Sequence, residues 1–246
     1  MRMLQPVGEL ANDDLETAYA YPAERTWSRL NFVATLDGAT ADQTGRSDGL
    51  SAPGDQRVFA LLRSLADVIV VGAGTARTEG YAPVRPHEVD TALRHRLGLA
   101  PLPPLAVVSR SLDLPDDLLG GVEPGADTLV ITCATAPAAA LSAVRERAEV
   151  LVCGADAVDH REAREQLAAR GLRRILSEGG PSLAGAMAAV GALDELCLTL
   201  SPLVLAGDAG RMATGPLIDP ALRLRHAHAI ADGDHLLLRY VRVGAH

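Results

Sequence analysis

The run VIVVGAGTARTEG, from Val68 to Gly80, decides the fold class of this chain. Its first four residues are all apolar, which predicts a strand buried on both faces in the central sheet of an α/β domain. Gly72 and Gly74 allow the backbone to turn sharply and to approach a ligand closely where the strand ends. Backbone amides freed at a strand-to-helix turn form a natural site for phosphate, so we interpret this turn as part of a nucleotide site.

Length and composition limit the classes to which the chain can belong. The 246 residues are 48% hydrophobic, which is ample for a substantial core. No apolar run reaches the roughly 18 residues that a membrane span needs, and no signal-peptide pattern is present, so we expect a cytoplasmic protein without membrane contact. The net charge of −8 disfavours nucleic acid as a partner. All 23 basic residues are arginine, which removes a lysine Schiff base from consideration.

Cysteine and histidine residues give no sign of a metal site. Cys133, Cys153 and Cys197 lie far apart, each in an apolar run, and we expect buried thiols in a reducing compartment. His226 and His228 alternate along a predicted strand, but two ligands with no third in view make a poor site. We therefore expect no metal.

Hydrophobic periodicity predicts strands that alternate with helices over most of the chain. Residues 1–25 are polar and are interpreted as an N-terminal arm with one short helix at Asp13–Tyr19, and residues 26–246 as a single domain. Glu79–Pro104 is rich in proline and charge and is expected to be an exposed excursion. The predicted strands are Arg29–Thr35, Val68–Val71, Leu105–Val108, Thr128–Cys133, Glu149–Cys153 and Arg174–Ser177, and the predicted helices are Pro53–Ala66 (capped by Ser51), Pro137–Arg147, Arg161–Arg170 and one opening in EGGPSLAGAM.

The C-terminal part changes character. Glu195–Ser201, Leu222–Ala231 and His235–Val243 are predicted strands with no helices between them, and Asp232–Asp234 is a hairpin turn. The expected fold is therefore α/β, with a mixed, mostly parallel sheet flanked by helices and an antiparallel C-terminal edge.

Three glycine-bearing turns directly follow predicted strands. They are LDG (Leu36–Gly38), GAGT (Gly72–Thr75) and EGGP (Glu178–Pro181). Ligands of open α/β sheets bind at the carboxyl ends of the strands, where all three turns are expected to lie. GAGTAR lacks the third glycine of GxGxxG, which disfavours an ordinary Rossmann unit. EGGP places amides at a helix N-terminus and a proline in its first turn.

Five segments in this order resemble the pyrimidine reductase family of riboflavin biosynthesis. They are NFVATLDG, the Gly45-Arg46-Ser47 turn, LLRSLADVIVVGAGT, SEGGPSLAGAM and DELCLTLSPLVLAG. The resemblance implies the fold of dihydrofolate reductase. It also implies a reductase that takes hydride from NADPH and delivers it to a C=N bond, with 5-amino-6-(5-phosphoribosylamino)uracil as substrate and its ribitylamino derivative as product. Members of this family are usually homodimers, so the resemblance further implies a homodimer.

The resemblance assigns residues to the cofactor, NADPH. Arg110 could in addition pair with a 2′-phosphate, which would favour NADPH over NADH. The matching positions are the turn residues Gly72, Gly74 and Thr75; Glu79, where the family usually has Asp; Val33 toward the nicotinamide; Ser111 toward the adenosine; and Gly179, Gly180, Pro181, Ser182 and Leu183 toward the phosphates.

The resemblance also implies substrate contacts from Ser47, Arg63, Arg85 and Glu178. The two arginines suit a phosphate because a fork of donors fits that anion. Reduction of a C=N bond needs a group that handles a proton, and Asp37 and Glu178 are the two strand-end carboxylates in reach. We expect Glu178 to anchor the substrate. Asp37 either takes part in proton handling or only bonds its own turn backbone.

The chain also departs from the family pattern. EGYAPVRP stands in place of the usual DDPxLTxR, which leaves the substrate open. One alternative is a dihydrofolate or pterin reductase of the same fold, and another is a non-catalytic nucleotide-binding protein. The sequence has no HxE followed by PCxxC, so we expect no zinc deaminase domain.

Overall fold

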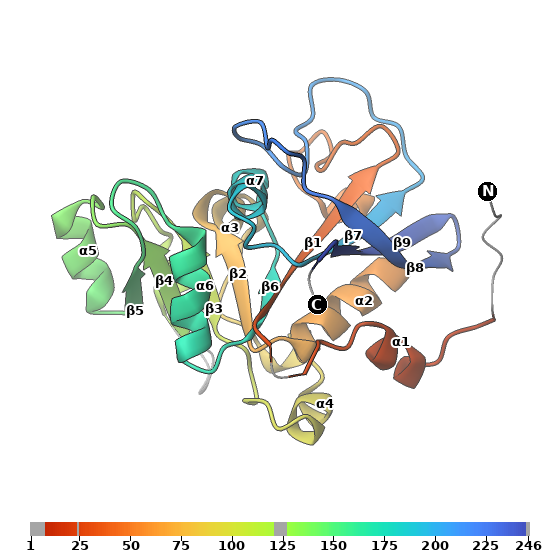
Figure 1. Cartoon of the computed structure of the whole chain (residues 1–246), viewed down its shortest axis with the longest axis horizontal. Coiled ribbons are helices and arrows are strands. Elements are labelled where there is room, and N and C mark those ends of the chain that lie inside the picture. The colour runs from red at the N-terminus through yellow and green to blue at the C-terminus, as the bar shows by residue number, and fades with distance from the viewer. Residues whose placement is uncertain (1–7, 24, 121–126, 245–246) are drawn as a thin grey trace.

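The computed structural model describes residues 8–23, 25–120 and 127–244, and these residues form one nine-stranded sheet with helices on both faces (Figure 1). The strands are β1 (Trp27–Thr35), β2 (Val68–Gly72), β3 (Leu105–Val108), β4 (Thr128–Thr132), β5 (Glu149–Val152), β6 (Arg174–Ser177), β7 (Glu195–Ser201), β8 (Leu224–Asp232) and β9 (His235–Arg242). Their order in the sheet is β5-β4-β3-β2-β6-β1-β7-β9-β8.

The helices connect most of the parallel strands. They are α1 (Asn12–Ala18), α2 (Pro53–Leu65), α3 (Ala73–Glu79), α4 (Thr91–Arg96), α5 (Ala138–Arg145), α6 (His160–Ala169) and α7 (Pro181–Ala189), with short 3-10 helices η1 (Asp48–Leu50), η2 (Pro86–Glu88) and η3 (Asp116–Leu119). The strands from β5 to β7 all pair in parallel, whereas β9 pairs antiparallel with β7 and with β8. The predicted mixed sheet with an antiparallel C-terminal edge is therefore confirmed.

Strand β2 lies near the centre of the sheet and is buried on both faces. Val68 and Val70 belong to the cluster that packs against α6 and α7, whereas Ile69 and Val71 belong to the cluster that packs against α2. Successive side chains of a strand point to opposite faces, so an uninterrupted apolar run is what a doubly covered strand requires. The prediction that Val68–Val71 form a strand buried on both faces is thus confirmed.

The neighbours of β2 bring the three glycine turns to one edge. β6 lies between β2 and β1, and all three strands run parallel. Their carboxyl ends, and the turns that follow them, therefore meet at the same side of the sheet. The pairing continues beyond β6, because the Gly72 N–H donates to the Gly179 carbonyl at 2.7 Å.

Two sequence predictions about segments next to α2 were wrong. Ser51 does not cap α2: the N-cap is Ala52, no side chain bonds the cap amides, and the Ser51 hydroxyl bonds the Asp55 carboxylate. Glu79–Pro104 is not an exposed excursion, because its apolar side chains enter the main core. Those side chains are Val84, Val89, Leu93 and Leu102, all less than 10% exposed.

Arg94 explains how such a charged segment can be buried. Its side chain is fully inaccessible, and its guanidinium donates to the carbonyls of Ser64, Ala66 and Ala100. Two of these carbonyls lie at the C-terminal end of α2, where backbone acceptors lack helical partners. The Arg94 guanidinium therefore connects α4 to the end of α2. A charged residue in this segment thus does not indicate exposure to solvent.

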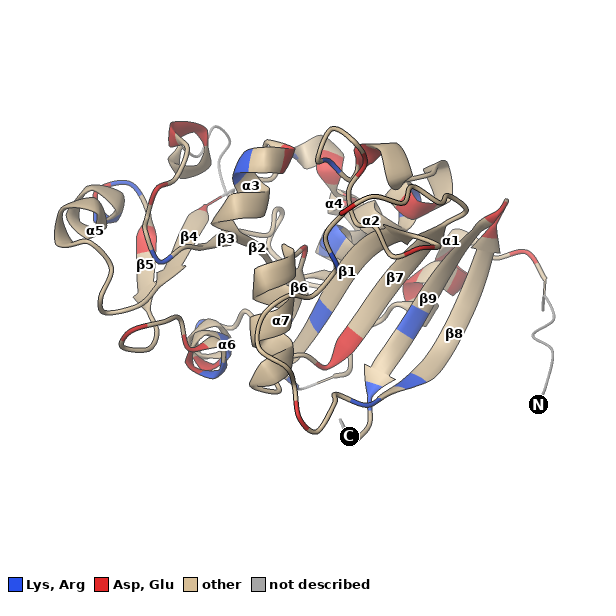
Figure 2. Cartoon of the chain, turned by 90° about the horizontal axis from the view of Figure 1, so that it is seen from above, with Lys and Arg blue, Asp and Glu red and all other residues tan. Residues whose placement is uncertain are grey.

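A second buried charge network joins α1 to the sheet. Arg29 and Glu195 face each other on β1 and β7, both with fully buried side chains and an Nε–Oε1 distance of 2.6 Å. Arg239 on β9 adds a second guanidinium at 2.8 Å, so that one acidic and two basic side chains meet across β1, β7 and β9, which lie side by side in Figure 2. The two arginines also donate to the Tyr19 and Ala18 carbonyls at the end of α1.

The expected N-terminal arm thus includes a helix that packs on the domain. Leu15 and Tyr19 are buried in the same cluster as α2. The three cysteines are free thiols and buried, as expected. Within the described ranges, none of the helices combines the length and the apolar character that crossing a membrane would take.

Replacing Glu195 by Gln should destabilise the protein and flatten its acid sensitivity. Burial alone would raise the pKa of Glu195, but the guanidinium groups of Arg29 and Arg239 outweigh it and lower the pKa to about 2. The carboxylate therefore stabilises the fold above pH 4.5, its ordinary pKa, and this contribution is lost as the pH falls toward 2.

At pH 7, denaturant titration of Glu195→Gln should give an unfolding free energy lower by about 3–5 kcal/mol, because the buried Arg29 and the partly buried Arg239 lose their counter-charge. The unfolding free energy of Glu195→Gln should also change less with pH in the acidic range than that of the wild type. Glu149→Gln is the control, since its pair with Arg170 is solvent-exposed and is worth less than about 1 kcal/mol. Equal losses in both variants would contradict this assignment.

Candidate active site

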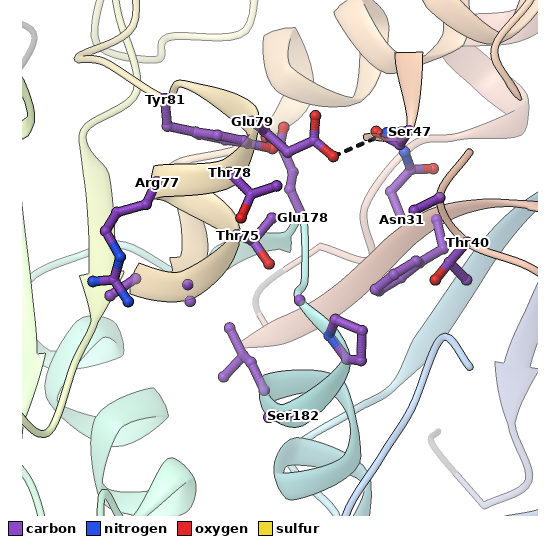
Figure 3. A pocket seen from close by; sticks show the side chains of 18 of the residues that line it. Asn31, Thr40, Ser47, Thr75, Arg77, Thr78, Glu79, Tyr81, Glu178 and Ser182 are labelled. Atoms are coloured by element: carbon purple, nitrogen blue, oxygen red, sulfur yellow. Dashed lines mark hydrogen bonds between the residues drawn. The ribbon is translucent and has the colours of Figure 1, made fainter. Parts of the chain in front are cut away.

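A cavity of about 1130 Å³ opens at the carboxyl ends of β1, β2, β3 and β6. Its walls come from α2, from α3, from the start of α7 and from the loop after β1. Figure 3 shows Asn31, Thr40 and Ser47 on one side, and Thr75, Arg77 and Thr78 of α3 on the other. A pocket at this edge of a parallel sheet is where open α/β folds bind ligands, and its size suits a dinucleotide together with a substrate.

Two of the three predicted glycine turns line the cavity. The residues of GAGT come from the start of α3, and Gly180, Pro181, Ser182 and Leu183 come from the start of α7. Gly179 stands just outside the lining, where its carbonyl accepts from Gly72. None of the LDG residues 36–38 belongs to the lining, although Thr40 and Ala41 just beyond them do.

Close packing between these two turns explains their glycines. A Cβ atom on Gly180 would lie 2.0 Å from the Thr75 hydroxyl, and one on Gly179 would lie 2.6 Å from the Phe32 ring. Gly179 also has a φ of +86°, which L side chains rarely adopt. Gly74 differs from both, because a Cβ there would meet nothing within 4 Å and would point into open space.

The start of α7 offers the pocket backbone amides that could bind an anion. The first amides of a helix have no intrahelical acceptor and carry the positive end of the helix dipole. Gly180 is the N-cap, and the following residues line the cavity. This arrangement fits the diphosphate of a nucleotide cofactor.

Glu178, at the end of β6, is held by a network of buried side chains. Arg63 donates to both carboxylate oxygens, from Nε at 2.8 Å and from Nη2 at 2.7 Å, and the Tyr81 hydroxyl donates at 2.8 Å. Arg63 also pairs with Glu88 at 2.6 Å. The structure therefore brings together Arg63 and Glu178, two of the predicted substrate residues. They form an ion pair with each other.

Burial and charge act together on the members of this network. Burial disfavours the cation of Arg63, yet the Glu178 carboxylate prevails and the pKa of Arg63 is raised. Burial, followed by the charge of Glu178, raises the pKa of Tyr81 well above 10. At neutral pH the network consequently contains a charged guanidinium and a protonated phenol that donates to Glu178.

Glu79 and Ser47 meet at the mouth of the pocket. The Ser47 amide donates to Glu79 Oε1 at 3.0 Å, drawn as the dashed line in Figure 3, and an Arg46 amino group donates to the Glu79 carbonyl. Both predicted residues line the cavity. Glu79 thus fastens the loop after β1 to the end of α3.

The far end of the cavity holds the residues predicted for the adenosine side. Arg110 and Ser111 follow β3, line the cavity and are exposed, and Val33 of β1 lines it nearer the centre. His160, at the start of α6, also lines this end and was missed by the sequence analysis. Burial lowers the pKa of His160, so its ring is uncharged at neutral pH.

Besides Gly179, two predicted residues lie outside the cavity lining. Asp37 accepts from the Thr35 hydroxyl and from the amides of Leu205 and Ala206, contacts that favour the structural alternative for this residue. These bonds, that of Thr35 foremost, lower the pKa of Asp37. Arg85 is exposed, and its amide bonds Glu88.

The pocket also contains residues that the sequence analysis did not select. Asp55 and Phe59 share one face of α2 with the predicted Arg63, at intervals of four residues, and Tyr81 and Glu88 come from the segment between α3 and α4. The four-residue spacing was a usable signal, because it places these side chains on one helix face. Among the described residues, no group of three His, Cys, Asp or Glu side chains could hold a metal ion.

The open space at Gly74 gives a direct test of the cofactor wall. Gly74→Val should fold normally, because its side chain meets no neighbour, but it should weaken NADPH binding about tenfold or more, which corresponds to about 1.4 kcal/mol. Fluorescence titration with NADPH measures the loss, and thermal unfolding checks the fold. Gly120→Val is the matched control, since Gly120 also has no neighbour within 4 Å and lies outside the cavity lining. Unchanged NADPH binding by a folded Gly74→Val variant would remove this wall from the cofactor site.

Comparison with known proteins gives a consistent result. Residues 26–238 match the family model described as the RibD C-terminal domain. A 2,5-diamino-6-ribosylamino-4(3H)-pyrimidinone 5′-phosphate reductase of Methanothermobacter thermautotrophicus is 30% identical over 224 residues, which cover 89% of this chain and 100% of that protein. The protein of the same name from Archaeoglobus fulgidus is 28% identical over 221 residues, with coverage of 89% and 100%.

Solved structures share the fold. A pyrimidine reductase-like protein from Corynebacterium diphtheriae has a TM-score of 0.79 at 26% identity and covers 93% of this chain and 98% of its own. The RibD protein of Acinetobacter baumannii has a TM-score of 0.69 at 18% identity, with coverage of 90% of this chain and 59% of that one.

Proposed function

The chain belongs to the family of the RibD C-terminal domain, and from this membership we propose that it is an NADPH-dependent reductase of a phosphorylated ribosylamino-pyrimidine. The observation that carries the proposal is the pocket, in which a glycine-built wall for a cofactor adjoins an end that contains the Arg63–Glu178–Tyr81 network. Both reductase relatives are matched over their whole length, so the proposal concerns their full activity.

The residues present fit the cofactor. The amides at the start of α7 would hold its diphosphate, and the uncovered backbone at Gly74 would allow close approach. Arg110 would meet the 2′-phosphate, and Val33 would lie toward the nicotinamide. When bound, NADPH would supply the hydride that reduces the substrate.

The residues at the other end handle the substrate. In a ribosylamine, the C1′–O4′ bond opens as O4′ takes a proton and the exocyclic nitrogen loses one, which leaves a C1′=N bond. Hydride added at C1′ is balanced by one further proton at the nitrogen. Tyr81 stays protonated at neutral pH, so its hydroxyl remains a hydrogen-bond donor that holds Glu178 in place at this end of the pocket. Glu178, fixed by Arg63, would orient the substrate.

One observation favours the second candidate, a dihydrofolate or pterin reductase. Arg85 is exposed outside the lining, and both arms of the Arg63 guanidinium already meet carboxylates. In this arrangement Arg85 lies too far out to receive the phosphate of a ribosylamino-pyrimidine, and the donors of Arg63 are already occupied. A pterin needs no such cation. The homodimer and the cytoplasmic location stay predictions.

The deciding experiment is an NADPH-oxidation assay on the ribosylamino-pyrimidine phosphate and on dihydrofolate, side by side. We expect steady turnover of the pyrimidine, a product heavier by two hydrogens in mass spectrometry, and slower turnover with NADH than with NADPH. Turnover of dihydrofolate alone would establish the second candidate instead. If the protein binds NADPH but reduces neither compound, the result would favour a non-catalytic nucleotide-binding protein.

Glu178→Gln should separate substrate handling from cofactor binding. The amide keeps the shape but removes the charge that faces Arg63, and Glu88 still pairs with that guanidinium. We expect kcat/KM for the pyrimidine to fall about 10- to 100-fold, the value of a hydrogen bond to a charged group, while NADPH affinity stays within about twofold. The readouts are steady-state kinetics and fluorescence titration, and an equal loss in both would contradict the role of Glu178 as the substrate anchor.

A further inference from the structure

Asp55 is a buried carboxylate in the pocket to which the proposed reaction gives no role. It lies on α2, is 8% exposed and lines the cavity. Its Oδ1 accepts from the Thr199 hydroxyl at 2.6 Å, and its Oδ2 accepts from the Ser51 hydroxyl. Within the described part of the chain, no arginine or histidine nitrogen comes within the 4.0 Å of a salt bridge to this carboxylate.

The contrast with Glu178 shows which carboxylate is available. Glu178 accepts three hydrogen bonds and is neutralised by Arg63, whereas Asp55 accepts two, both from neutral hydroxyls. A carboxylate has about four acceptor sites, so Asp55 has room for two further donors. Burying a carboxylate with no cation beside it is costly unless other donors complete its shell. A ligand with two N–H groups would do so.

The position of Asp55 on the helix places it apart from the Glu178 network. Asp55, Phe59 and Arg63 occupy one face of α2, and eight residues of helix separate the first from the last by about 12 Å. Phe59 and Phe32 supply aromatic surface to the same cavity. The wall therefore offers a carboxylate, an apolar stretch and an ion pair in sequence, which suits a flat heterocycle with its sugar directed toward Glu178.

We propose, on the basis of the proposed function, that Asp55 is a specificity-determining residue that receives the 2-amino and N3–H groups of the pyrimidine. In a 2-amino-4(3H)-pyrimidinone these two groups are adjacent parallel donors that match the two oxygens of a carboxylate. In the corresponding uracil, C2 carries a carbonyl oxygen in place of the amino group and would face a carboxylate oxygen without a proton between them. The enzyme therefore prefers the 2-amino substrate, so that reduction comes before the loss of the 2-amino group.

A purely structural role of Asp55 makes a different prediction. Asp55 is the third residue of α2, where a carboxylate is stabilised by the helix dipole, and its bond to Thr199 joins the helix to β7. If this were its whole role, substitution would lower stability and affect both pyrimidines equally. Only a contact with the ring changes the ratio of the two activities.

The test compares kcat/KM for the 2,5-diamino-pyrimidinone and the 5-amino-uracil ribosylamine phosphates in the wild type and in Asp55→Asn. We expect the wild type to prefer the diamino compound about 100-fold, because a site built for N–H donors rejects the analogue that lacks one. Asparagine can accept from N3–H and donate to a C2 carbonyl, so Asp55→Asn should reverse the preference. Asp13→Asn, an exposed change on α1, is the control and should leave the ratio unaltered.

A second measurement needs no variant and holds even if Asp55→Asn folds poorly. The free bases 2-amino-4(3H)-pyrimidinone and uracil are compared as inhibitors of the wild type. The amino base should inhibit at concentrations at least about tenfold lower.

Equal inhibition by the two bases, or a substrate ratio that Asp55→Asn leaves unchanged, would overturn the role of Asp55 while the proposed reductase activity stands. Turnover of neither pyrimidine by the wild type would instead remove the proposed function and this inference together.

Discussion

The hydrogen bond from the Gly72 amide to the Gly179 carbonyl is the contact on which the pocket depends. It continues the parallel pairing of β2 and β6 past the last residue of β6 and so holds the starts of α3 and α7 against each other. The space between them is filled by the Thr75 hydroxyl, which leaves no room for a side chain on Gly180. The proposed cofactor wall is consequently part of the sheet rather than a loop attached to it, and such sites are held more precisely.

Three of the buried carboxylates, Glu195, Glu178 and Asp55, differ in what surrounds them, and that difference separates their roles. Glu195 lies between two guanidinium groups in the core and belongs to the fold. Glu178 has one guanidinium and one phenol and belongs to the lining of the pocket, where these two partners fix it. Asp55 has only hydroxyl donors. The fewer charged partners a buried carboxylate has, the more of its interaction remains for a ligand.

The sequence predicted the sheet well because its signals there are local. The apolar run of β2 and the hairpin at Asp232–Asp234 depend only on neighbouring residues. The exposure of Glu79–Pro104 was mispredicted because the burial of Arg94 depends on carbonyls of α2, distant in sequence. Asp37 and Arg85 were selected by motif position, which says nothing of where a side chain points. Asp55 could have been found because it lies two steps of four residues from Arg63 on one face of α2, but its partner Thr199 lies far along the chain.

The end of α1 has a consequence for how this domain is delimited. The match to the family model begins at residue 26, yet the carbonyls of Ala18 and Tyr19 accept from the guanidinium groups of the partly buried Arg239 and the buried Arg29. A fragment cut at residue 26 would leave two charged donors without these acceptors. The stretch that matches the family model is thus smaller, by one helix, than the unit that can be expected to fold on its own.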